Sequence, residues 1–109
     1  MERAIDRLEP FQRAISKAHL ASAGVSIDAL ESRPLIAIAN SWNEVCPGHE
    51  PLKKLAEEVK KGILEAGGEP IEFNTIAMCD GIAQGHPGMR YCLPHRDIIT
   101  DSCEAMIIG

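Results

Sequence analysis

Blocks of hydrophobic and polar residues alternate along the chain, and their spacing predicts helices at its start. Apolar residues recur at helical spacing from Pro10 until Gly24, which is a typical helix stop. A separate helical turn is expected over residues 4–8, and residues 26–31 are typical of a helix cap followed by one turn. Residues 1–32 are therefore predicted to form an amino-terminal helical segment.

The middle of the chain has the pattern of a strand followed by an amphipathic helix. Residues 35–39 form a continuous apolar run, which is typical of a strand buried on both faces. Residues 51–66 carry one apolar stripe opposite a charged face, with Glu57 and Lys61 spaced to pair. Gly62 falls on the apolar side of this helix, so we expect the helix to approach a sheet closely there.

A second strand and a last helix complete the pattern, over residues 70–77 and 94–108. One face of the strand is expected to hold Ile71, Phe73, Thr75 and Ala77. The inward face of the helix is expected to hold Ile98, Ile99, Ser102, Cys103 and Met106. Strand, helix and strand together predict a right-handed parallel βαβ unit. The expected fold class is α/β, with residues 33–109 as the incomplete start of a three-layer domain.

Two loops after the predicted strands hold most of the side chains that could carry chemistry. Ligands in open α/β folds bind beyond the carboxyl ends of the strands, and parallel strands place both ends at one edge. We therefore expect the loops over residues 40–49 and 78–89 to converge. The candidate site residues in these loops are Asn40, Cys46, His49, Cys79, Asp80 and His86.

Charge and cysteine usage exclude several classes of protein. The chain has 11 Lys and Arg against 16 Asp and Glu, a net charge of -5, so neither nucleic acid nor an anionic membrane is expected as a partner. No apolar run is long enough for a transmembrane helix, and the start lacks the apolar core of a signal peptide. We expect a cytoplasmic protein with four reduced cysteines, whose spacing excludes a zinc ribbon.

Short motifs follow one another in a fixed order along the second half of the chain. They read IAIANSWNE at 36–44, PGH at 47–49, EFNTIA at 72–77, CDGIA at 79–83, GH at 85–86, GM at 88–89, LP at 93–94, RD at 96–97 and DS at 101–102. Together they resemble the opening of the dihydroxy-acid dehydratase and phosphogluconate dehydratase family, from about residue 33 to residue 109.

The resemblance implies an iron–sulfur, magnesium-dependent hydro-lyase. Such an enzyme removes water from a 2,3-dihydroxy acid or a sugar acid and leaves a 2-keto acid; the dihydroxy-acid branch serves branched-chain amino acid biosynthesis. A cluster iron would act as Lewis acid on the departing 3-hydroxyl, while Mg²⁺ would hold the carboxylate and 2-hydroxyl. The stretch at 73–77 resembles the dihydroxy-acid branch, and the MCDG at 78–81 also occurs in phosphogluconate dehydratases.

Site roles follow from the same resemblance and from the two loops. The resemblance assigns Asp80 to magnesium. From their place in the two loops, Cys79 and Cys46 are candidate cofactor ligands, although Cys46 lies two residues before the position of the family's ligand cysteine. His49, His86 and Asn40 are expected to line the substrate site. Gly48 stands where members with a two-iron cluster have a ligand cysteine, and glycine cannot bind iron. The PGH motif is similar to that of members described as four-iron enzymes, and both four-iron and two-iron clusters stay open.

Family enzymes are several times longer, and we expect this chain to be their amino-terminal part and inactive alone, with a homodimer as the full-length form. Three alternatives stay open. The protein could be a phosphogluconate or other aldonate dehydratase, or a non-catalytic remnant that binds a partner through its sheet edge. It could also be a small metal- or redox-sensing module that uses Cys46 and Cys79.

Overall fold

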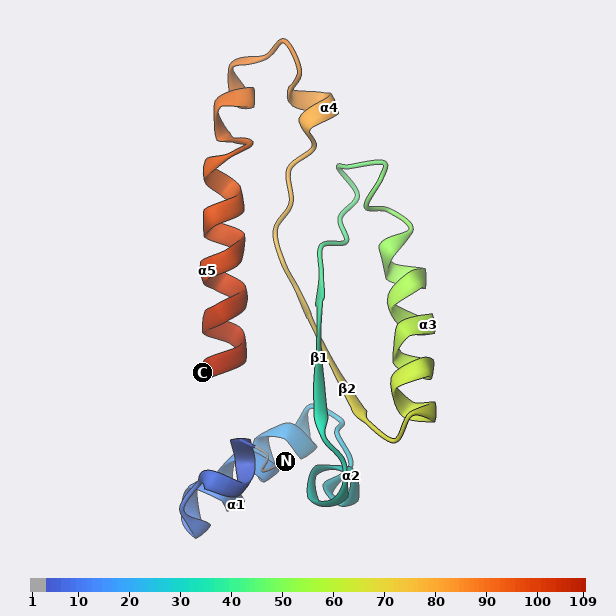
Figure 1. The fold of residues 1–109 in the computed structure, drawn as a ribbon, viewed down its shortest axis with the longest axis vertical. Coiled ribbons are helices and arrows are strands. Elements are labelled where there is room, and N and C mark those ends of the chain that lie inside the picture. The colour runs from blue at the N-terminus through green and yellow to red at the C-terminus, as the bar shows by residue number, and fades with distance from the viewer. Residues whose placement is uncertain (1–3) are drawn as a thin grey trace. The chain divides into compact units, whose positions relative to one another are not determined.

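Helices and strands alternate in the computed structural model of the protein, which describes residues 4–109 (Figure 1). In chain order the elements are η1 (Ala4–Arg7), α1 (Pro10–Ser22), α2 (Ile27–Ser32), β1 (Leu35–Asn40), α3 (Leu52–Glu65), β2 (Glu69–Asn74), α4 (Asp80–Ala83), η2 (Pro87–Tyr91) and α5 (Pro94–Ile108). The helices η1, α1, α2, α3 and α5 confirm the sequence predictions. The short helices α4 and η2 were not predicted.

The two strands pair in parallel. The Glu69 N–H donates to the Pro34 carbonyl at 2.9 Å, and the Thr75 N–H donates to the Asn40 carbonyl at 2.7 Å. The two bonds join residues at the same sequence offset, which only a parallel register allows. The α/β class with a parallel strand–helix–strand unit is therefore confirmed, while the right-handed crossover and the third layer stay predictions.

The chain divides into two compact units, and both strands and α3 contribute to each. The first unit comprises Met1–Ile36 with Gly62–Ile71, and the second comprises Ala37–Lys61 with Glu72–Gly109. In the first unit, Ser26 caps α2 by accepting a hydrogen bond from the Ala29 N–H. The fully buried Leu30 lies on that helix.

Glycines mark the ends of two helices. Gly24 follows α1 with φ +99°, and Gly67 follows α3 with φ +84°, a region that favours glycine. A Cβ on Gly62 would meet nothing within 4 Å, so the predicted close approach at this residue is wrong. The close approach lies instead at Gly68, where a Cβ would sit 2.9 Å from Cγ2 of Ile63.

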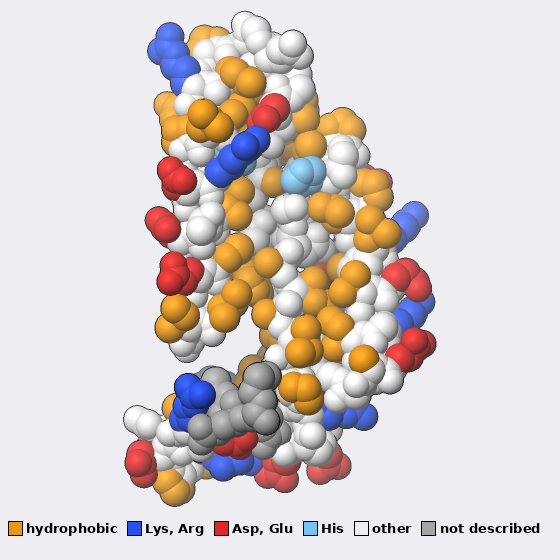
Figure 2. Space-filling view, in the orientation of Figure 1, with side chains coloured by type: hydrophobic (Ala, Val, Ile, Leu, Met, Phe, Trp, Pro, Cys, Tyr) orange, Lys and Arg blue, Asp and Glu red, His pale blue; other side chains and the backbone are white. Residues whose placement is uncertain are grey.

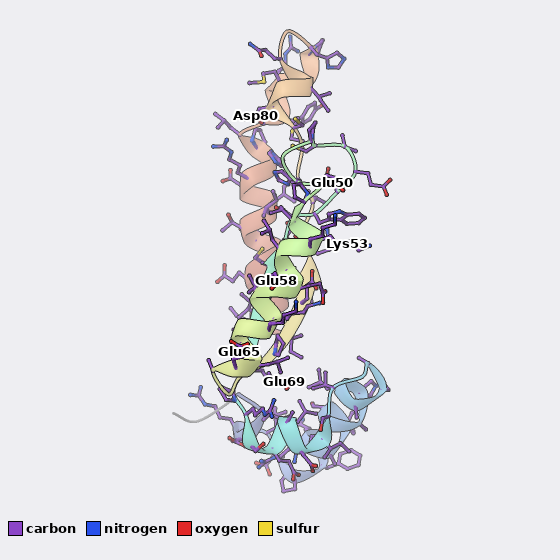
Figure 3. The ribbon with its side chains drawn as sticks, turned by 90° about the vertical axis from the view of Figure 1, so that its right-hand side faces the viewer. Glu50, Lys53, Glu58, Glu65, Glu69 and Asp80 are labelled. Carbon is purple, nitrogen blue, oxygen red and sulfur yellow. The ribbon has the colours of Figure 1, made fainter. Side chains whose placement is uncertain are left out.

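Charged side chains on the solvent face of α3 form ion pairs with one another. The pairs lie three residues apart, whereas the predicted pair of Glu57 and Lys61 lies four apart. Lys60 pairs with Glu57 at 2.8 Å and Lys61 pairs with Glu58 at 2.5 Å, both three residues apart. Figure 3 looks onto the outer side of this helix and shows Glu58 there. The buried residue of α3 is Ala56, on the apolar stripe.

The strands are less buried than predicted. Leu35 and Ile36 of β1 are 37% and 40% exposed, so burial on both faces is wrong. Among residues 4–109 the sheet has only two strands, so β1 has a neighbouring strand on one side only. The predicted alternation in and beyond β2 is confirmed, since its expected face is half-buried and the residues between are exposed.

The last helix has the predicted bounds but not the whole predicted inward face. Ile99 and Cys103 are half-buried, whereas Ile98, Ser102 and Met106 are exposed. Within its unit α5 contacts η2, and residues 104–109 at the end of the chain are exposed. Hydrophobic side chains accordingly reach the surface over the strands and along α5 (Figure 2). No helix in the described part of the chain is long and apolar enough to cross a membrane.

Candidate functional site

The segments that follow β1 and β2 are tied together, as the parallel topology predicts. The Asn43 side chain donates from Nδ2 to the Ala77 carbonyl at 3.2 Å. In return, Asn74 donates from Nδ2 to the Trp42 carbonyl at 3.1 Å. These cross-connections place the two loops at one edge of the sheet, within the second unit.

Two pockets open at this edge. The first, here called the polar pocket, has a volume of about 400 Å³ and is lined by Ser41, Cys46, His49, Thr75, Ala77, Met78, Cys79, Asp80, His95, Arg96 and Ile99. The second, the apolar pocket, has a volume of about 620 Å³; His86 lines it, and Cys79 lines both. We place the candidate site in the smaller pocket, because it holds the titratable side chains.

Four of the six predicted site residues therefore meet in the polar pocket. They are Cys46, His49, Cys79 and Asp80. His86 lies apart, on the apolar pocket, and Asn40 lines neither pocket.

Cys79 directly precedes α4, at the N-cap position of that helix. The backbone N–H of Ile82 lowers the pKa of the Cys79 thiol most, followed by the Cys46 side chain. Desolvation and the negative charge of Asp80 act in the opposite direction and raise this pKa. Cys46 is buried, and its N–H donates to Oδ1 of Asn43 at 2.7 Å. Cys46 and Cys79 thus both present sulfur to the polar pocket, and the pKa of the Cys79 thiol lies below its usual range.

Asp80 begins α4 and is an exposed carboxylate (Figure 3). Its Oδ2 lies 3.6 Å from Nη2 of Arg96, a long ion pair between two exposed side chains. A hydrogen bond with Asp80 also raises the pKa of the Cys92 thiol, with burial as the next cause. Asp80 thus keeps a hard oxygen donor at the pocket, of the type that Mg²⁺ binds.

The two predicted histidines present different ring nitrogens. Nδ1 of His49 lies 2.7 Å from the Ser41 carbonyl, which can only accept, so Nδ1 carries the proton and Nε2 keeps a lone pair. Nδ1 of His86 accepts from the Gly88 N–H at 2.9 Å, so its neutral ring carries the proton on Nε2. Of the two, His49 has the ring able to accept a proton or bind a metal in its present arrangement.

Two titratable residues of the polar pocket, His95 and Arg96, were not among the predicted site residues. Nδ1 of His95 donates to the Cys92 carbonyl at 2.8 Å, and Nε2 accepts from the Met78 N–H at 3.4 Å. His95 therefore joins the segment before Cys79 to the start of α5. Arg96 follows it and faces Asp80. The signal for both was their position in the first turn of a helix that directly follows the second loop.

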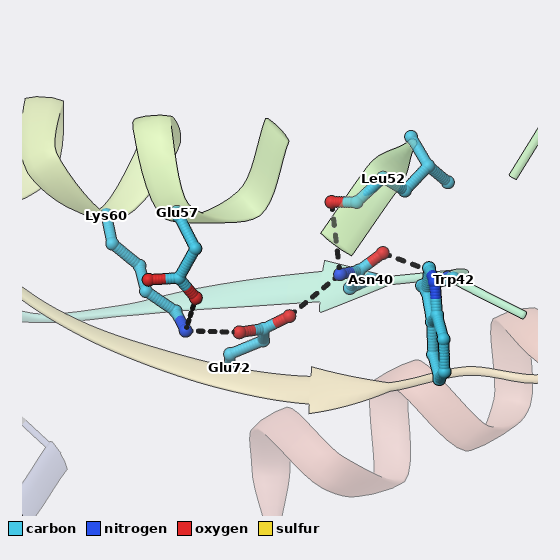
Figure 4. Close-up of polar contacts among 6 residues, drawn as sticks. All are labelled: Asn40, Trp42, Leu52, Glu57, Lys60 and Glu72. Atoms are coloured by element: carbon cyan, nitrogen blue, oxygen red, sulfur yellow. Dashed lines mark hydrogen bonds and ion pairs between the residues drawn. The ribbon is translucent and has the colours of Figure 1, made fainter. Parts of the chain in front are cut away.

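Asn40 belongs to a different polar cluster, the Asn40–Glu72–Lys60 network (Figure 4). Its Nδ2 donates to Oε1 of Glu72 at 2.7 Å, and its Oδ1 accepts from the Trp42 N–H at 2.9 Å. Oε2 of Glu72 pairs with Nζ of Lys60, which also pairs with Glu57. The amide of Asn40 is only 6% exposed, and its hydrogen bonds join the end of β1 to β2 and α3.

The electrostatics of this network are mutually stabilising. The hydrogen bond from Asn40, and next the one from Lys60, lower the pKa of Glu72. Hydrogen bonds to Glu57 and then Glu72 raise the pKa of Lys60. Each charged form is therefore favoured by its partners.

The side chains of the polar pocket are of the types that bind metal cofactors, but too few of them lie together to hold a metal ion alone. Residues 4–109 hold no group of three or more His, Cys, Asp and Glu side chains arranged to bind one metal ion. The pair Cys46 and Cys79 offers two sulfur ligands suited to iron, and Asp80 offers one oxygen ligand suited to magnesium. A complete coordination shell would need further ligands from elsewhere.

These features define an α/β protein with sulfur and carboxylate donors at the carboxyl edge of parallel strands. A sequence profile described as "Dihydroxy-acid/6-phosphogluconate dehydratase N-terminal" matches residues 33–109. The chain belongs to this family, and the resemblance seen in its motifs is confirmed.

The curated relatives of this chain are named dihydroxy-acid dehydratases. The chain is 62% identical over 81 residues to a dihydroxy-acid dehydratase of Ignicoccus hospitalis, which covers 74% of this chain and 15% of that protein. It is 52% identical to dihydroxy-acid dehydratase 1 of Methanosarcina acetivorans, over 88% of this chain and 17% of the relative. It is 53% identical to a dihydroxy-acid dehydratase of Acetivibrio thermocellus, over 91% of this chain and 18% of that relative. The chain therefore spans less than a fifth of the length of these relatives.

Proposed function

We propose that the whole protein is an iron–sulfur hydro-lyase that dehydrates 2,3-dihydroxy acids to 2-keto acids in branched-chain amino acid biosynthesis. The observation that carries the proposal is the polar pocket, which gathers Cys46, His49, Cys79 and Asp80 at the edge where α/β folds bind ligands. The names of the relatives support the substrate class.

In this proposal the residues of the polar pocket divide into soft and hard donors. Cys79 and Cys46 would bind an iron–sulfur cluster of four or two irons, together with ligands from outside residues 4–109. Asp80 would bind Mg²⁺. When bound, iron would supply a Lewis acid for the leaving hydroxyl, and magnesium would hold the substrate carboxylate and 2-hydroxyl.

The remaining residues act on orientation and charge. His49 presents the lone pair of Nε2 toward a substrate hydroxyl, since Nδ1 is held by Ser41. Arg96 lies 3.6 Å from Asp80 and offers a positive charge next to the metal carboxylate. His86 would line the neighbouring apolar pocket, and Asn40 would hold the strand ends that carry both loops.

Further parts of the proposal concern the organisation of the protein. We assign residues 1–32 to a helical segment and residues 33–109 to the start of the dehydratase domain. A small-molecule acid as ligand, a homodimer and a cytoplasmic location complete the proposal.

A second candidate is a phosphogluconate or other aldonate dehydratase. It is favoured by the family description, which covers both activities, and by the MCDG motif at residues 78–81. The two candidates share the chemistry of the polar pocket and differ in the substrate that reaches it.

A segment exchange tests the proposal. Residues 33–109 of this chain replace the matching segment of the Ignicoccus hospitalis dehydratase, and the chimaera is reconstituted with iron, sulfide and Mg²⁺ without oxygen. We expect formation of a 2-keto acid from a branched 2,3-dihydroxy acid within about tenfold of the parent rate, and a far slower reaction with 6-phosphogluconate.

The outcomes separate the candidates. A preference of the chimaera for 6-phosphogluconate would favour the second candidate. A folded chimaera that binds iron like its parent but turns over neither acid would favour a non-catalytic module. The 109-residue chain reconstituted in the same way serves as the control, and we expect no turnover from it because it holds no three-donor metal group in residues 4–109.

A further inference from the structure

The chain that leads to Asp80 has no regular secondary structure of its own. Residues 75–79, between β2 and α4, are neither helix nor strand. The helix α4 is only four residues long, and its N-cap residue Cys79 makes no side-chain capping hydrogen bond. A helix this short does not stabilise its own conformation. The direction of the Asp80 carboxylate therefore depends on what holds the chain just before it.

His95, in the first turn of α5, contacts this segment through its ring. Nε2 accepts from the Met78 N–H at 3.4 Å, two residues before Asp80. Nδ1 lies 2.8 Å from the Cys92 carbonyl and 3.2 Å from the Tyr91 carbonyl. Because carbonyls only accept, Nδ1 carries the proton, and Nε2 of the neutral ring has the lone pair that the Met78 N–H needs. The ring thus connects residue 78 to the start of α5.

The first turn of α5 is a stable point of attachment for the segment. The helix starts at Pro94, whose ring fixes the backbone φ, and it continues for 15 residues. The same turn also reaches Asp80 directly, since Nη2 of Arg96 lies 3.6 Å from Oδ2 of Asp80. Both of those side chains are exposed, so water weakens their ion pair. His95 is half-buried, and its hydrogen bond acts on the backbone itself.

We propose that His95 is a positioning residue for the metal carboxylate, because its bond to the Met78 N–H sets the backbone from which Asp80 projects. This inference rests on the proposed function, which assigns Asp80 to Mg²⁺. His95 itself touches neither metal nor substrate in this role. Removing a partner that orients a metal ligand typically weakens metal binding by about 10- to 100-fold.

Two amide variants separate positioning from support of the helix. In His95→Gln, the side-chain amide reaches the place of Nε2, so its oxygen can accept from the Met78 N–H. In His95→Asn, the shorter amide reaches only the place of Nδ1, so it can donate to the Cys92 carbonyl but not bind Met78. If His95 only stabilises the start of α5, Asn should serve at least as well as Gln.

Both variants are made in the chimaera that carries residues 33–109. Calorimetry measures Mg²⁺ binding to the iron-loaded protein without substrate, and mass spectrometry with residue-level fragmentation measures hydrogen exchange of the Met78 amide. For His95→Asn we expect about tenfold weaker Mg²⁺ binding and at least about threefold faster exchange. His95→Gln should stay within about twofold of the unsubstituted chimaera in both. The Ala66 N–H, which donates to the Gly62 carbonyl at 3.0 Å, is the internal control and should not change.

The outcomes are separable from those of the proposed function, because neither measurement needs turnover. Equal Mg²⁺ affinity in the two variants would overturn the proposal, whether or not their exchange rates differ. A Met78 amide that exchanges at the rate of an unstructured peptide in the unsubstituted chimaera would also overturn it, and this result needs no variant to fold. If the unsubstituted chimaera binds no Mg²⁺, the assignment of Asp80 fails, and Met78 exchange still decides whether His95 holds the segment.

Discussion

Two polar clusters lie in the second unit, and they differ in how completely their groups are partnered. In the Asn40–Glu72–Lys60 network, the amide of Asn40 and the carboxylate of Glu72 each have both ends engaged. In the polar pocket, Asp80 is exposed and lies 3.6 Å from Arg96, and Nε2 of His49 has no hydrogen-bond partner among residues 4–109.

The difference shows what a polar residue after a strand can do. Asn40 turns back onto the strand and helix beside it, and hydrogen bonds satisfy its buried amide. Asp80 lies at the start of a helix beyond the strand, where its carboxylate stays accessible. Full satisfaction indicates a role in stability, whereas spare donor and acceptor capacity indicates a role toward a ligand.

The largest expected effect comes from Asp80→Asn in the chimaera that carries residues 33–109. The amide keeps the shape but removes the charge that a hard cation prefers, so turnover should fall at least about 100-fold and require more Mg²⁺. Activity against Mg²⁺ concentration, iron content and thermal melting are measured, with Asp101→Asn on α5 as the matched control. Parental activity and an unchanged Mg²⁺ response in Asp80→Asn would indicate that Asp80 has a structural role and does not bind the metal.

The next effect concerns sulfur ligands. In the same chimaera, Cys79→Ser should lower iron content and activity by about half or more, because serine is a poor ligand for iron in a cluster. Cys103→Ser, on the half-buried side of α5, is the control and should keep both. Equal, near-parental iron content in the two variants would remove Cys79 from the site.

Asn40→Ala tests the structural cluster. It leaves the Trp42 N–H and one oxygen of Glu72 without their partner, and the expected cost is about 1–3 kcal/mol of unfolding free energy. Urea unfolding of the 109-residue protein is followed by the fluorescence of Trp42, the single tryptophan. The control is Asn74→Ala, an exposed residue for which we expect a smaller loss. A loss for Asn40→Ala no larger than for this control would contradict the structural role.

The smallest effect is a pH dependence at Glu72. Because its partners lower its folded pKa, Glu72 contributes stability above its unfolded pKa and loses it as pH falls through the folded pKa. The stability difference between wild type and Glu72→Gln should therefore shrink between about pH 7 and about pH 3. Lys60, whose pKa is raised, stays charged across this range and should not contribute to the change. A difference that stays constant with pH would argue against the carboxylate form as the stabilising one.

Local sequence signals predicted the helices well. Pro10 and Gly24 bracket α1, Pro94 begins α5, and the charged stripe of α3 predicted its solvent face. Such signals depend on neighbours within one or two turns, which the sequence displays directly. The exposure of β1 could not be predicted in this way, because burial depends on what other segments cover the strand.

For the candidate site, too, some features were predictable from the sequence and others depended on the tertiary structure. The residue types and their position after two strands were readable from the sequence, and so was the convergence of the loops, since parallel pairing follows from a strand–helix–strand order. Only the tertiary structure decided that Asn40 faces inward while Asp80 stays open, that His49 and His86 offer opposite ring nitrogens, and that Cys46 and Cys79 line one pocket. The inward position of Asn40 depends on its contact with Glu72, 32 residues further along the chain, and Cys46 and Cys79 reach one pocket through the packing of two separate loops. No local sequence pattern encodes such long-range packing.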